Sequence, residues 1–461
     1  MVKAVILFIV LIPSLTLAQD ITGIWNGKLS VQGMELRLVF HIAKADSIYD
    51  TKMDSPDQKA FGIQASATSF EDSTLTIEIA NLGIRYQGRH ISNGIEGFFY
   101  QSGQSFPLDL TRNLMEKKVF VRPQEPKMPY PYSSEEVRFP SEGGKIKLAG
   151  TLTLPKDGKS FPTAILITGS GPQNRDEEIM THKPFLVLAD HLTRSGIAVL
   201  RYDDRGFAQS TGSHDSATSA DFANDVRAAI AYLETRKEID KTQIGLIGHS
   251  EGGLIAPIVA ADTKVAFVVL LAGPGVPGSQ ILLKQVELIT RSGGLDEERV
   301  QSQLRVSRGA FDLFNEYGED ESFENQLEKY LHKVISNNEL IIPSGMSKEE
   351  LIKVQVMQFR NPWMRYFLKY DPVNSLHRIK CPVLALNGGK DVQVAPENLA
   401  VIEKAVRGGG NDNVTVKEFP HMNHLFQTCK TGAIDEYSTI EQTMDPLVLE
   451  EISDWVLKQT R

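Results

Sequence analysis

Residues 243–256 read Q-I-G-L-I-G-H-S-E-G-G-L-I-A, and this stretch decides the fold. The apolar residues before its central glycine predict a short buried strand of a parallel sheet, and Leu254 and Ile255 begin an apolar helix. Between them, residues 248–252 match the pattern G-x-S-x-G of a sharp strand-to-helix turn. Such a turn needs small flanking residues and raises the hydroxyl of Ser250 above the sheet edge. An ordinary turn is the alternative, but the strand and helix around it favour a nucleophilic serine.

The same turn predicts half of an anion site. The backbone N–H of Glu251 lies at the start of the predicted helix, where the helix dipole is positive and amides lack helical partners. A nucleophilic serine needs such a donor to stabilise the oxyanion that forms on its substrate. We therefore expect the Glu251 amide to contribute to an oxyanion hole.

The length of the chain limits the number of domains, and its net charge limits the kinds of binding partner. With 461 residues, two domains are the default, because single hydrophobic cores rarely grow so large. The net charge is −9 and the sequence has no basic block, which argues against nucleic acid as a partner. Composition leaves the oligomeric state open.

The first eighteen residues resemble a secretory signal peptide. Lys3 gives a positive start, residues 4–12 are apolar, and small residues precede a cut between Ala18 and Gln19. An uncleaved anchor is the alternative, but the apolar run is short for a bilayer, and no later run is long enough to span one. We expect an exported protein, periplasmic or secreted. Its two cysteines, Cys381 and Cys429, are expected at opposite ends of a sheet, too far apart for a disulfide.

Residues 19–115 have the pattern of an antiparallel all-β domain. Apolar residues alternate with polar ones, as at Leu36, Leu38 and Phe40, and turn residues separate the runs. Eight strands are predicted, at 23–31, 35–43, 49–53, 61–67, 74–80, 84–90, 95–100 and 106–111. This series predicts a small barrel-like domain or a sandwich. A ligand-binding barrel and an inert spacer both remain open.

A proline-rich stretch at 116–134 predicts a stiff, extended linker, and the pattern changes after it. From residue 135 to 461, strands and helices alternate, which predicts a mostly parallel α/β sheet. After a hairpin at 136–154, strands are expected at 163–168, 197–202, 265–272, 381–386 and 414–419, besides the strand before Ser250. Helices are expected at 184–195, after a cap at Ser219, and from Asp445 onward.

Residues 277–375 form an insertion between two of these strands. Their helical periodicity and an aromatic end that includes Trp363 and Phe367 predict a helical subdomain. Because strands deliver their carboxyl ends to this edge of the sheet, we expect the insertion to lie over the site as a cap. A packing subdomain without a gating role is the alternative.

Two further residues complete a predicted triad with Ser250. Asp391 follows the strand at 381–386 after a Gly-Gly turn, and His424 follows the strand at 414–419. The order Ser, Asp, His along the chain is the α/β-hydrolase order. His421 lies in the same loop, but His424 is three residues farther from the strand and has more reach toward both partners.

The second oxyanion donor is expected in the loop that follows the strand at 163–168. This loop reads G-S-G-P-Q-N-R-D over residues 169–176, and its glycines allow the backbone to approach a substrate carbonyl. The N–H of Ser170 is the candidate donor. We expect Arg175 and Asp176 to pin the loop by a local ion pair, with substrate contact as the alternative.

Four motifs together resemble a group of bacterial serine carboxylesterases of the α/β-hydrolase superfamily. They are the G-S-G-P-x-x-R-D loop, G-H-S-E-G-G, G-x-K-D-x-Q-V at 388–394 and N-H-L-F-Q at 423–427. The resemblance covers about residues 135–461 and implies Ser250, Asp391 and His424 as the triad, with the amides near Ser170 and Glu251 as the oxyanion hole. It implies no metal and no organic cofactor. The loop lacks a histidine before Gly169, unlike lipases, which argues against long-chain triglycerides.

The sequence thus predicts an exported serine esterase that acts on a small-molecule ester through an acyl-enzyme. A serine peptidase related to prolyl oligopeptidases shares this fold, but its usual propeller is longer than the β-rich region here. A secreted protein that binds a hydrophobic ligand in the barrel is the non-enzymatic alternative.

Overall fold

The computed structural model describes residues 20–460 apart from 32–33, 47, 59, 102–103, 115–119, 341 and 343–346. The predicted signal peptide, residues 1–18, lies outside the described residues. The chain divides into two compact units, of which the first comprises residues 20–31 and 35–117 and the second residues 118–461.

The N-terminal unit is one antiparallel sheet of ten strands in the order β4-β3-β2-β1-β10-β8-β7-β6-β5, with β9 paired to β8. Two of the eight predicted strands were wrong. The range 61–67 covers β4 but only the first residue of β5, and the range 106–111 joins the end of β9 to β10. The strands are β1 Gly23–Val31, β2 Met34–Ala45, β3 Ile48–Ser55, β4 Ala60–Gln64, β5 Ala67–Glu71, β6 Thr74–Ile79, β7 Ile84–Ile91, β8 Gly94–Gln101, β9 Gln104–Pro107 and β10 Leu110–Thr111.

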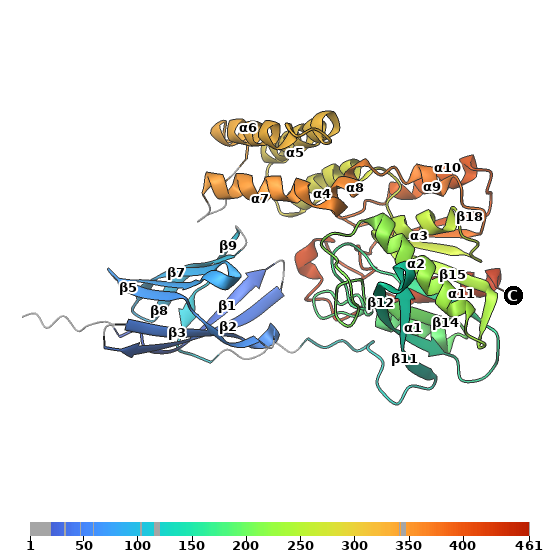
Figure 1. Ribbon diagram of the computed structural model, residues 1–461, viewed down its shortest axis with the longest axis horizontal. Helices are drawn as coiled ribbons and strands as arrows, with labels where there is room; N and C mark the ends of the chain where they lie inside the picture. Colours follow the sequence, from blue (N-terminus) through green and yellow to red (C-terminus); the bar gives the residue numbers. More distant parts are fainter. Residues whose placement is uncertain are drawn as a thin grey trace, which may run out of the picture. The chain divides into compact units, whose positions relative to one another are not determined.

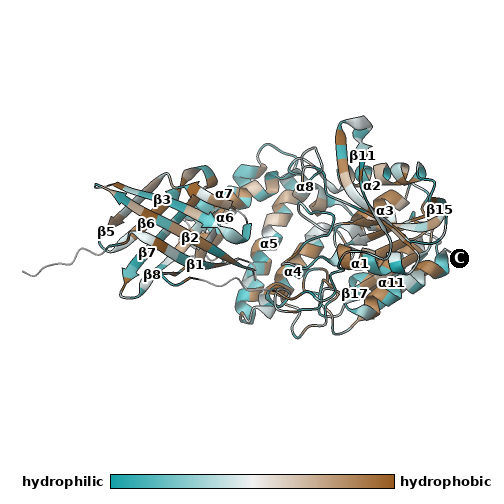
Figure 2. Cartoon of the chain, turned by 90° about the horizontal axis from the view of Figure 1, so that it is seen from below, coloured by the Kyte–Doolittle hydropathy of each residue, from teal (hydrophilic) through white to brown (hydrophobic). Residues whose placement is uncertain are grey.

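This sheet encloses a single apolar core, which the alternating sequence explains. Every second residue of a strand points to the same face, so Leu38, Phe40 and Ile42 of β2 are buried together. Trp25 and Tyr86 join them from β1 and β7. Hydrophilic and hydrophobic colours alternate along these strands in Figure 2. The prediction of a small, barrel-like, antiparallel domain is confirmed.

The described part of the proline-rich stretch is hydrogen-bonded to the second unit. Arg122 donates to the carbonyls of Ile440 and Ser438 at 2.7 and 3.0 Å, and Gln124 donates to the carbonyl of Met444 at 2.6 Å. Local composition predicts an extended linker but cannot reveal partners more than 300 residues away. These residues therefore act as a strap on the second unit rather than as a free spacer.

The second unit is built on an eight-stranded sheet in the order β11-β12-β14-β13-β15-β16-β17-β18. The hairpin β11–β12 is antiparallel and joins β14, and all strands from β14 to β18 are mutually parallel. The bounds are β11 Ser133–Ser141, β12 Ile146–Leu154, β13 Phe161–Ile167, β14 Ala198–Tyr202, β15 Ile239–His249, β16 Val268–Leu271, β17 Val383–Gly388 and β18 Val414–Phe419.

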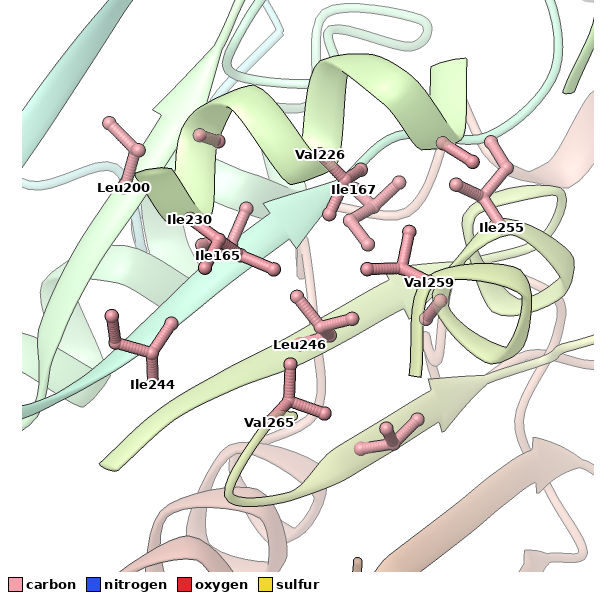
Figure 3. Packing of buried hydrophobic residues seen from close by; sticks show 14 of the residues in the cluster. Ile165, Ile167, Leu200, Val226, Ile230, Ile244, Leu246, Ile255, Val259 and Val265 are labelled. Carbon is pink, nitrogen blue, oxygen red and sulfur yellow. The ribbon is translucent and has the colours of Figure 1, made fainter. Parts of the chain in front are cut away.

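Helices cover both faces of this sheet (Figure 1). Helices α1 Pro184–Arg194 and α11 Pro446–Gln459 share one core with the sheet, around Phe185, Phe267 and Ile452. Helices α2 Ser219–Glu234, α3 Gly252–Ala260 and α10 Asn398–Gly408 share the other. Figure 3 shows Val226 and Ile230 of α2 above the isoleucines of β13. This is the α/β-hydrolase arrangement, and the predicted fold class is confirmed.

The insertion between β16 and β17 is helical, as predicted. It has its own apolar core around Phe314 and Leu327. Its helices are α4 Gly278–Ser292, α5 Glu297–Tyr317, α6 Phe323–Ser336, α7 Lys348–Arg360, α8 Pro362–Lys369 and α9 Val373–Leu376. No helix of the described residues combines the length and the hydropathy that crossing a bilayer demands. Both cysteines are free and half-buried.

Candidate active site

The turn after β15 is a strained elbow with Ser250 at its tip. Ser250 has a φ of 52°, a left-handed conformation that costs a side-chain-bearing residue about 1–3 kcal/mol. A Cβ at Gly248 would lie 2.0 Å from the Gly252 carbonyl oxygen, and one at Gly252 would lie 2.1 Å from that of Ile167. Only glycine fits both positions, because nearby backbone atoms fill the space. The G-x-S-x-G pattern is therefore required by the close packing of this turn.

Asp391 and His424 meet at the carboxyl ends of β17 and β18. His424 Nδ1 lies 2.7 Å from Asp391 Oδ2, and both side chains are buried. The other oxygen of Asp391 accepts hydrogen bonds from the amides of Gln393 and Val394 at 2.8 and 2.9 Å. The carboxylate is thus fixed by backbone donors on one side and orients the imidazole with the other. This arrangement leaves Nε2 of His424 to face a partner.

The loop that carries His424 is closed on itself by the residues of the N-H-L-F-Q motif. The Asn423 side-chain oxygen accepts from the amides of Leu425 and Gln427, both at 3.0 Å, and the Asn423 amide donates to the Gln427 carbonyl at 3.0 Å. His421 of the same loop is exposed, whereas His424 is buried beside Asp391. The structure therefore brings His424, and not His421, to the aspartate.

Ser250 and His424 line one cavity of about 770 Å³. Among the described residues no hydrogen bond joins the Ser250 hydroxyl to the His424 ring, and such bonds often tighten only when substrate is bound. The cap contributes much of the apolar lining, through Ile281, Leu282, Ile289, Trp363 and Phe367. The insertion predicted as a cap therefore forms one wall of the cavity.

The predicted oxyanion loop passes directly over the nucleophile. A Cβ on Gly169 would lie 3.2 Å from the Ser250 Cβ, and Ser170 and Glu251 line the cavity with Ser250. The N–H of Glu251 precedes the first turn of α3, where helical partners are missing. Both predicted donors therefore lie at the same cavity as the serine.

The turn after β14 holds this loop. Asp204 accepts from the Thr168 hydroxyl at 2.7 Å and from the Gln173 amide at 2.8 Å. Burial raises the pKa of Asp204 well above its ordinary value, although these two hydrogen bonds oppose the shift. Burial therefore disfavours the charged form of the Asp204 carboxyl, and the two hydrogen bonds from the loop offset part of that cost.

The predicted ion pair between Arg175 and Asp176 was wrong. Arg175 pairs with Asp203 at 2.8 Å, and Asp176 pairs with Arg201. Both residues still pin the loop, but they do so through side chains of β14 and the turn after it. Arg175 and Asp176 are the two central residues of a turn that is closed by a hydrogen bond from the Glu177 amide to the Asn174 carbonyl. Each side chain pairs with a residue of another segment instead of with its neighbour.

Glu251 follows the serine and is a buried carboxyl that the sequence did not single out. Its Oε1 accepts from the Ser219 hydroxyl at 2.6 Å and from the Trp363 indole N–H at 2.7 Å. Burial raises the pKa of Glu251, while hydrogen bonds from Ser219, Trp363 and Ser170 oppose the shift.

The predicted cap of α2 at Ser219 was wrong. Thr218 is the N-cap of this helix and pairs with Asp221. The Ser219 hydroxyl instead donates to Glu251.

His249 and Glu177 form a second buried histidine–carboxylate pair beside the first. His249 Nδ1 lies 3.0 Å from Glu177 Oε1, and the His249 and His424 rings lie 4.7 Å apart. Burial disfavours a charge on His249, but the charge and hydrogen bond of Glu177, the hydrogen bond to the His424 carbonyl and the charge of Asp391 together raise the pKa of the imidazole. The only sequence feature that could have indicated this pair is the histidine inside the G-x-S-x-G motif. Nothing local pointed to Glu177.

Within the described part of the chain, no three His, Cys, Asp or Glu side chains gather as metal ligands would. The site is built from a serine, a histidine–aspartate pair and backbone amides. These are the groups that nucleophilic acyl transfer requires: a nucleophile, a general base and oxyanion donors.

A family model described as serine aminopeptidase, S33, matches residues 183–428, just over half of the chain. The chain belongs to the serine aminopeptidase S33 family. In this S33 chain the matched range holds Ser250, Asp391 and His424, and it ends directly after the N-H-L-F-Q motif. The N-terminal unit and Glu177 lie outside that range.

The S33 chain is similar to Esterase EstD of Thermotoga maritima, with 26% identity over 314 residues. That match covers 68% of this chain and 66% of EstD, so the chain spans just under two thirds of the relative's length. An uncharacterized 31.7 kDa protein of Escherichia coli is 26% identical over 226 residues, covering 48% of this chain and 72% of that protein.

Solved structures with a likeness to the S33 chain include two esterases. The Pyrococcus furiosus esterase Pf2001 is 14% identical with a TM-score of 0.44 and covers 75% of this chain and 100% of that one. Est1E from Butyrivibrio proteoclasticus, solved with ferulic acid, is 19% identical with a TM-score of 0.43 and covers 70% of this chain and 99% of that one.

Proposed function

We propose that this protein is a serine hydrolase of carboxylic esters that works through an acyl-enzyme. One observation carries the proposal: a histidine fixed by a buried aspartate shares a cavity with a serine at the tip of a strained elbow. Membership of the S33 family and the similarity to an esterase support it.

The proposed mechanism assigns one step to each group. His424 takes the proton of the Ser250 hydroxyl as the oxygen attacks the ester carbonyl, and Asp391 stabilises the imidazolium that results. The amides of Ser170 and Glu251 hold the oxyanion of the tetrahedral intermediate. His424 returns its proton to the departing alcohol and then activates a water molecule, which releases the acid and restores the serine.

The lining of the cavity favours an uncharged ester. Apolar side chains come from the cap, from Met180 and from Leu425, and no lysine or arginine is among the described lining residues. The acidic groups at the cavity are Glu177, Glu251 and Asp435. Glu177 is paired with His249, but a negatively charged acyl group would still meet Glu251 and Asp435 with no lysine or arginine in the described lining to offset them. Neutral esters of short or medium length are therefore the proposed substrates.

Turnover of a panel of p-nitrophenyl and alkyl esters tests the proposal. The purified protein should hydrolyse neutral esters, and Ser250→Ala should lose on the order of 10⁴-fold or more in kcat. Ser336→Ala, an exposed serine of α6, is the matched control and should keep its activity. Equal activity of the Ser250→Ala and Ser336→Ala proteins would rule out Ser250 as the nucleophile.

A serine peptidase is the second candidate, because the matching family is described as a serine aminopeptidase. A Ser-His-Asp triad can cleave both amides and esters. The shape and lining of the cavity therefore determine which of the two substrate classes is preferred. Aminoacyl and peptidyl p-nitroanilides assayed beside the esters separate the two: faster amide turnover would favour the peptidase.

Export of the protein is proposed on the pattern of residues 1–18 alone. N-terminal sequencing of the protein from the cell envelope should begin at Gln19. A chain that retains Met1 would contradict export by this route.

A further inference from the structure

His249 has two ring nitrogens that each face a hydrogen-bond acceptor. Nε2 lies 3.0 Å from the backbone carbonyl oxygen of His424, and Nδ1 lies 3.0 Å from Glu177 Oε1. A carbonyl oxygen can only accept, so Nε2 must carry a hydrogen. An ionised carboxylate also only accepts, which requires a second hydrogen on Nδ1. An imidazole with both nitrogens protonated is a cation.

Glu177 connects this ring to the predicted oxyanion loop. Its Oε1 also accepts the Gly169 amide hydrogen at 2.7 Å, so one oxygen atom holds both Gly169 and His249. The chain of contacts therefore runs from Gly169 through Glu177 and His249 to the backbone of His424. It joins the loop above Ser250 to the loop that carries the base.

The pair has the burial and strain of a site under functional constraint. Glu177 is 1% exposed and His249 is 4% exposed. Glu177 Oε2 is buried without a hydrogen-bond partner, and Glu177 has a φ of 50°. Backbone strain and an unpartnered carboxylate oxygen both lower the stability of the fold. An ion pair with these costs is poorly explained by a contribution to stability alone.

We infer that Glu177 and His249 are positioning residues: an ion-paired bridge that fixes the oxyanion loop and the His424 loop relative to each other around Ser250. The inference rests on the proposed esterase mechanism, which requires both loops to act on the same substrate carbonyl. While it is protonated, the imidazole of His249 also places a positive charge beside the His424 ring.

The groups that face His249 support its charged state. Glu177 lies at Nδ1, and Asp391 and the ring of His424 are the other titratable groups near it. Burial opposes the charge, but attraction to Glu177, the hydrogen bonds and attraction to Asp391 together raise the pKa of His249. The charged form of His249 is therefore fully present below the ordinary imidazole pKa of about 6.5 and is lost as the pH rises through its raised pKa.

Two variants at Glu177 test the bridge through kinetics. Glu177→Ala leaves the Gly169 amide and the His249 ring without an acceptor, and we expect about a 10–100-fold loss of kcat, the effect of a buried group without its partner. Glu177→Gln keeps one acceptor oxygen but cannot hold the imidazolium, so about a tenfold loss is expected. KM should change less than about threefold in both, because the apolar side chains of the cap that line the cavity are unchanged.

Glu178→Gln is the matched control, since Glu178 is the exposed neighbour of Glu177. It should keep the kcat of the unchanged protein. Unchanged kcat in both Glu177 variants, or losses that arise in KM alone, would overturn the inference. If Glu177→Ala does not fold, as judged by circular dichroism, the Gln variant and the following measurement decide.

Nitrogen NMR of the ¹⁵N-histidine-labelled protein tests the charged bridge without any turnover. At about pH 7, both ring nitrogens of His249 should carry hydrogen, with the signals assigned by their loss in His249→Gln. An unprotonated nitrogen in the His249 ring at this pH would overturn the bridge. Because this readout needs no substrate, it stands even if the protein hydrolyses no ester, and an inactive protein would count against the proposed function alone.

Discussion

The two sheets of this protein differ in what they bury. In the N-terminal sheet the buried polar residues among those described are Asn26, Thr51 and Ser55, which are uncharged. The catalytic unit buries charged or titratable groups, including Glu177, His249, Glu251, Asp391 and His424. Burying such groups is costly unless they are paired, and they cluster where chemistry requires them. Buried charge thus separates the unit that holds the candidate site from the unit that is stabilised by apolar packing.

The largest effect should follow from removing the base. His424→Ala should lower turnover on the order of 10⁴-fold, as is typical of triad members, whereas His421→Ala should lose far less. The two histidines are three residues apart, but only His424 contacts Asp391. Ester turnover of both variants, with folding checked by circular dichroism, makes the comparison. An inactive His421→Ala protein with an active His424→Ala protein would reverse the assignment.

A matched pair of core substitutions should affect one unit each. Phe40 and Phe267 are both fully buried, in the N-terminal sheet and in the catalytic unit respectively. Each Phe→Ala change should lower the unfolding free energy of its own unit by about 3–5 kcal/mol. Calorimetry should show one lowered transition per variant, and Phe40→Ala should keep the kcat of the folded protein. Loss of kcat in Phe40→Ala would show that the N-terminal unit takes part in the reaction.

A smaller effect is expected in the pH dependence of stability. The folded-state pKa of His249 is raised, so its contribution to stability is fully present below the unfolded value of about 6.5 and is lost as the pH rises through the folded value. The difference in unfolding free energy between the unchanged protein and His249→Gln should therefore shrink as the pH rises. Urea unfolding at a series of pH values measures it, and a difference that grows with pH would contradict the sign.

The smallest effect should come from the cap. Trp363 donates to Glu251 and stacks on Phe367 with ring centroids 5.0 Å apart. Trp363→Phe keeps the stack and removes the hydrogen bond, worth about 0.5–1.5 kcal/mol, so kcat/KM should fall only several-fold. Tyr366→Phe, on the same helix, should not change kcat/KM. A loss above about 100-fold would mean that the cap contact is part of the catalytic machinery.

The sequence predicted those parts of the site that local pattern governs. Ser250, Asp391 and His424 each follow an apolar strand and a tight turn, and the ends of parallel strands meet at one sheet edge. Gly248 is required by contact with Gly252 in the same turn, whereas Gly252 is required by the backbone of Ile167 at the end of β13. A short-range pattern was therefore sufficient to place all three residues at one edge of the sheet, where Ser250 and His424 line the cavity and Asp391 lies behind His424.

The parts that the sequence missed depend on partners far along the chain. Glu177 meets His249 across 72 residues, and Trp363 meets Glu251 across 112. Their pairing follows from tertiary packing, which leaves no periodic signal in either segment. Strand divisions such as β4 and β5 were missed because turn and strand residues have overlapping preferences.

Covalent labelling of Ser250 tests the central claim most directly. A fluorophosphonate should add one equivalent to the purified protein, and peptide mapping should place it on Ser250, the serine at the elbow. His424→Ala should react far more slowly, because the hydroxyl has lost its base. Label on another serine, or labelling of His424→Ala at the unchanged rate, would contradict the account.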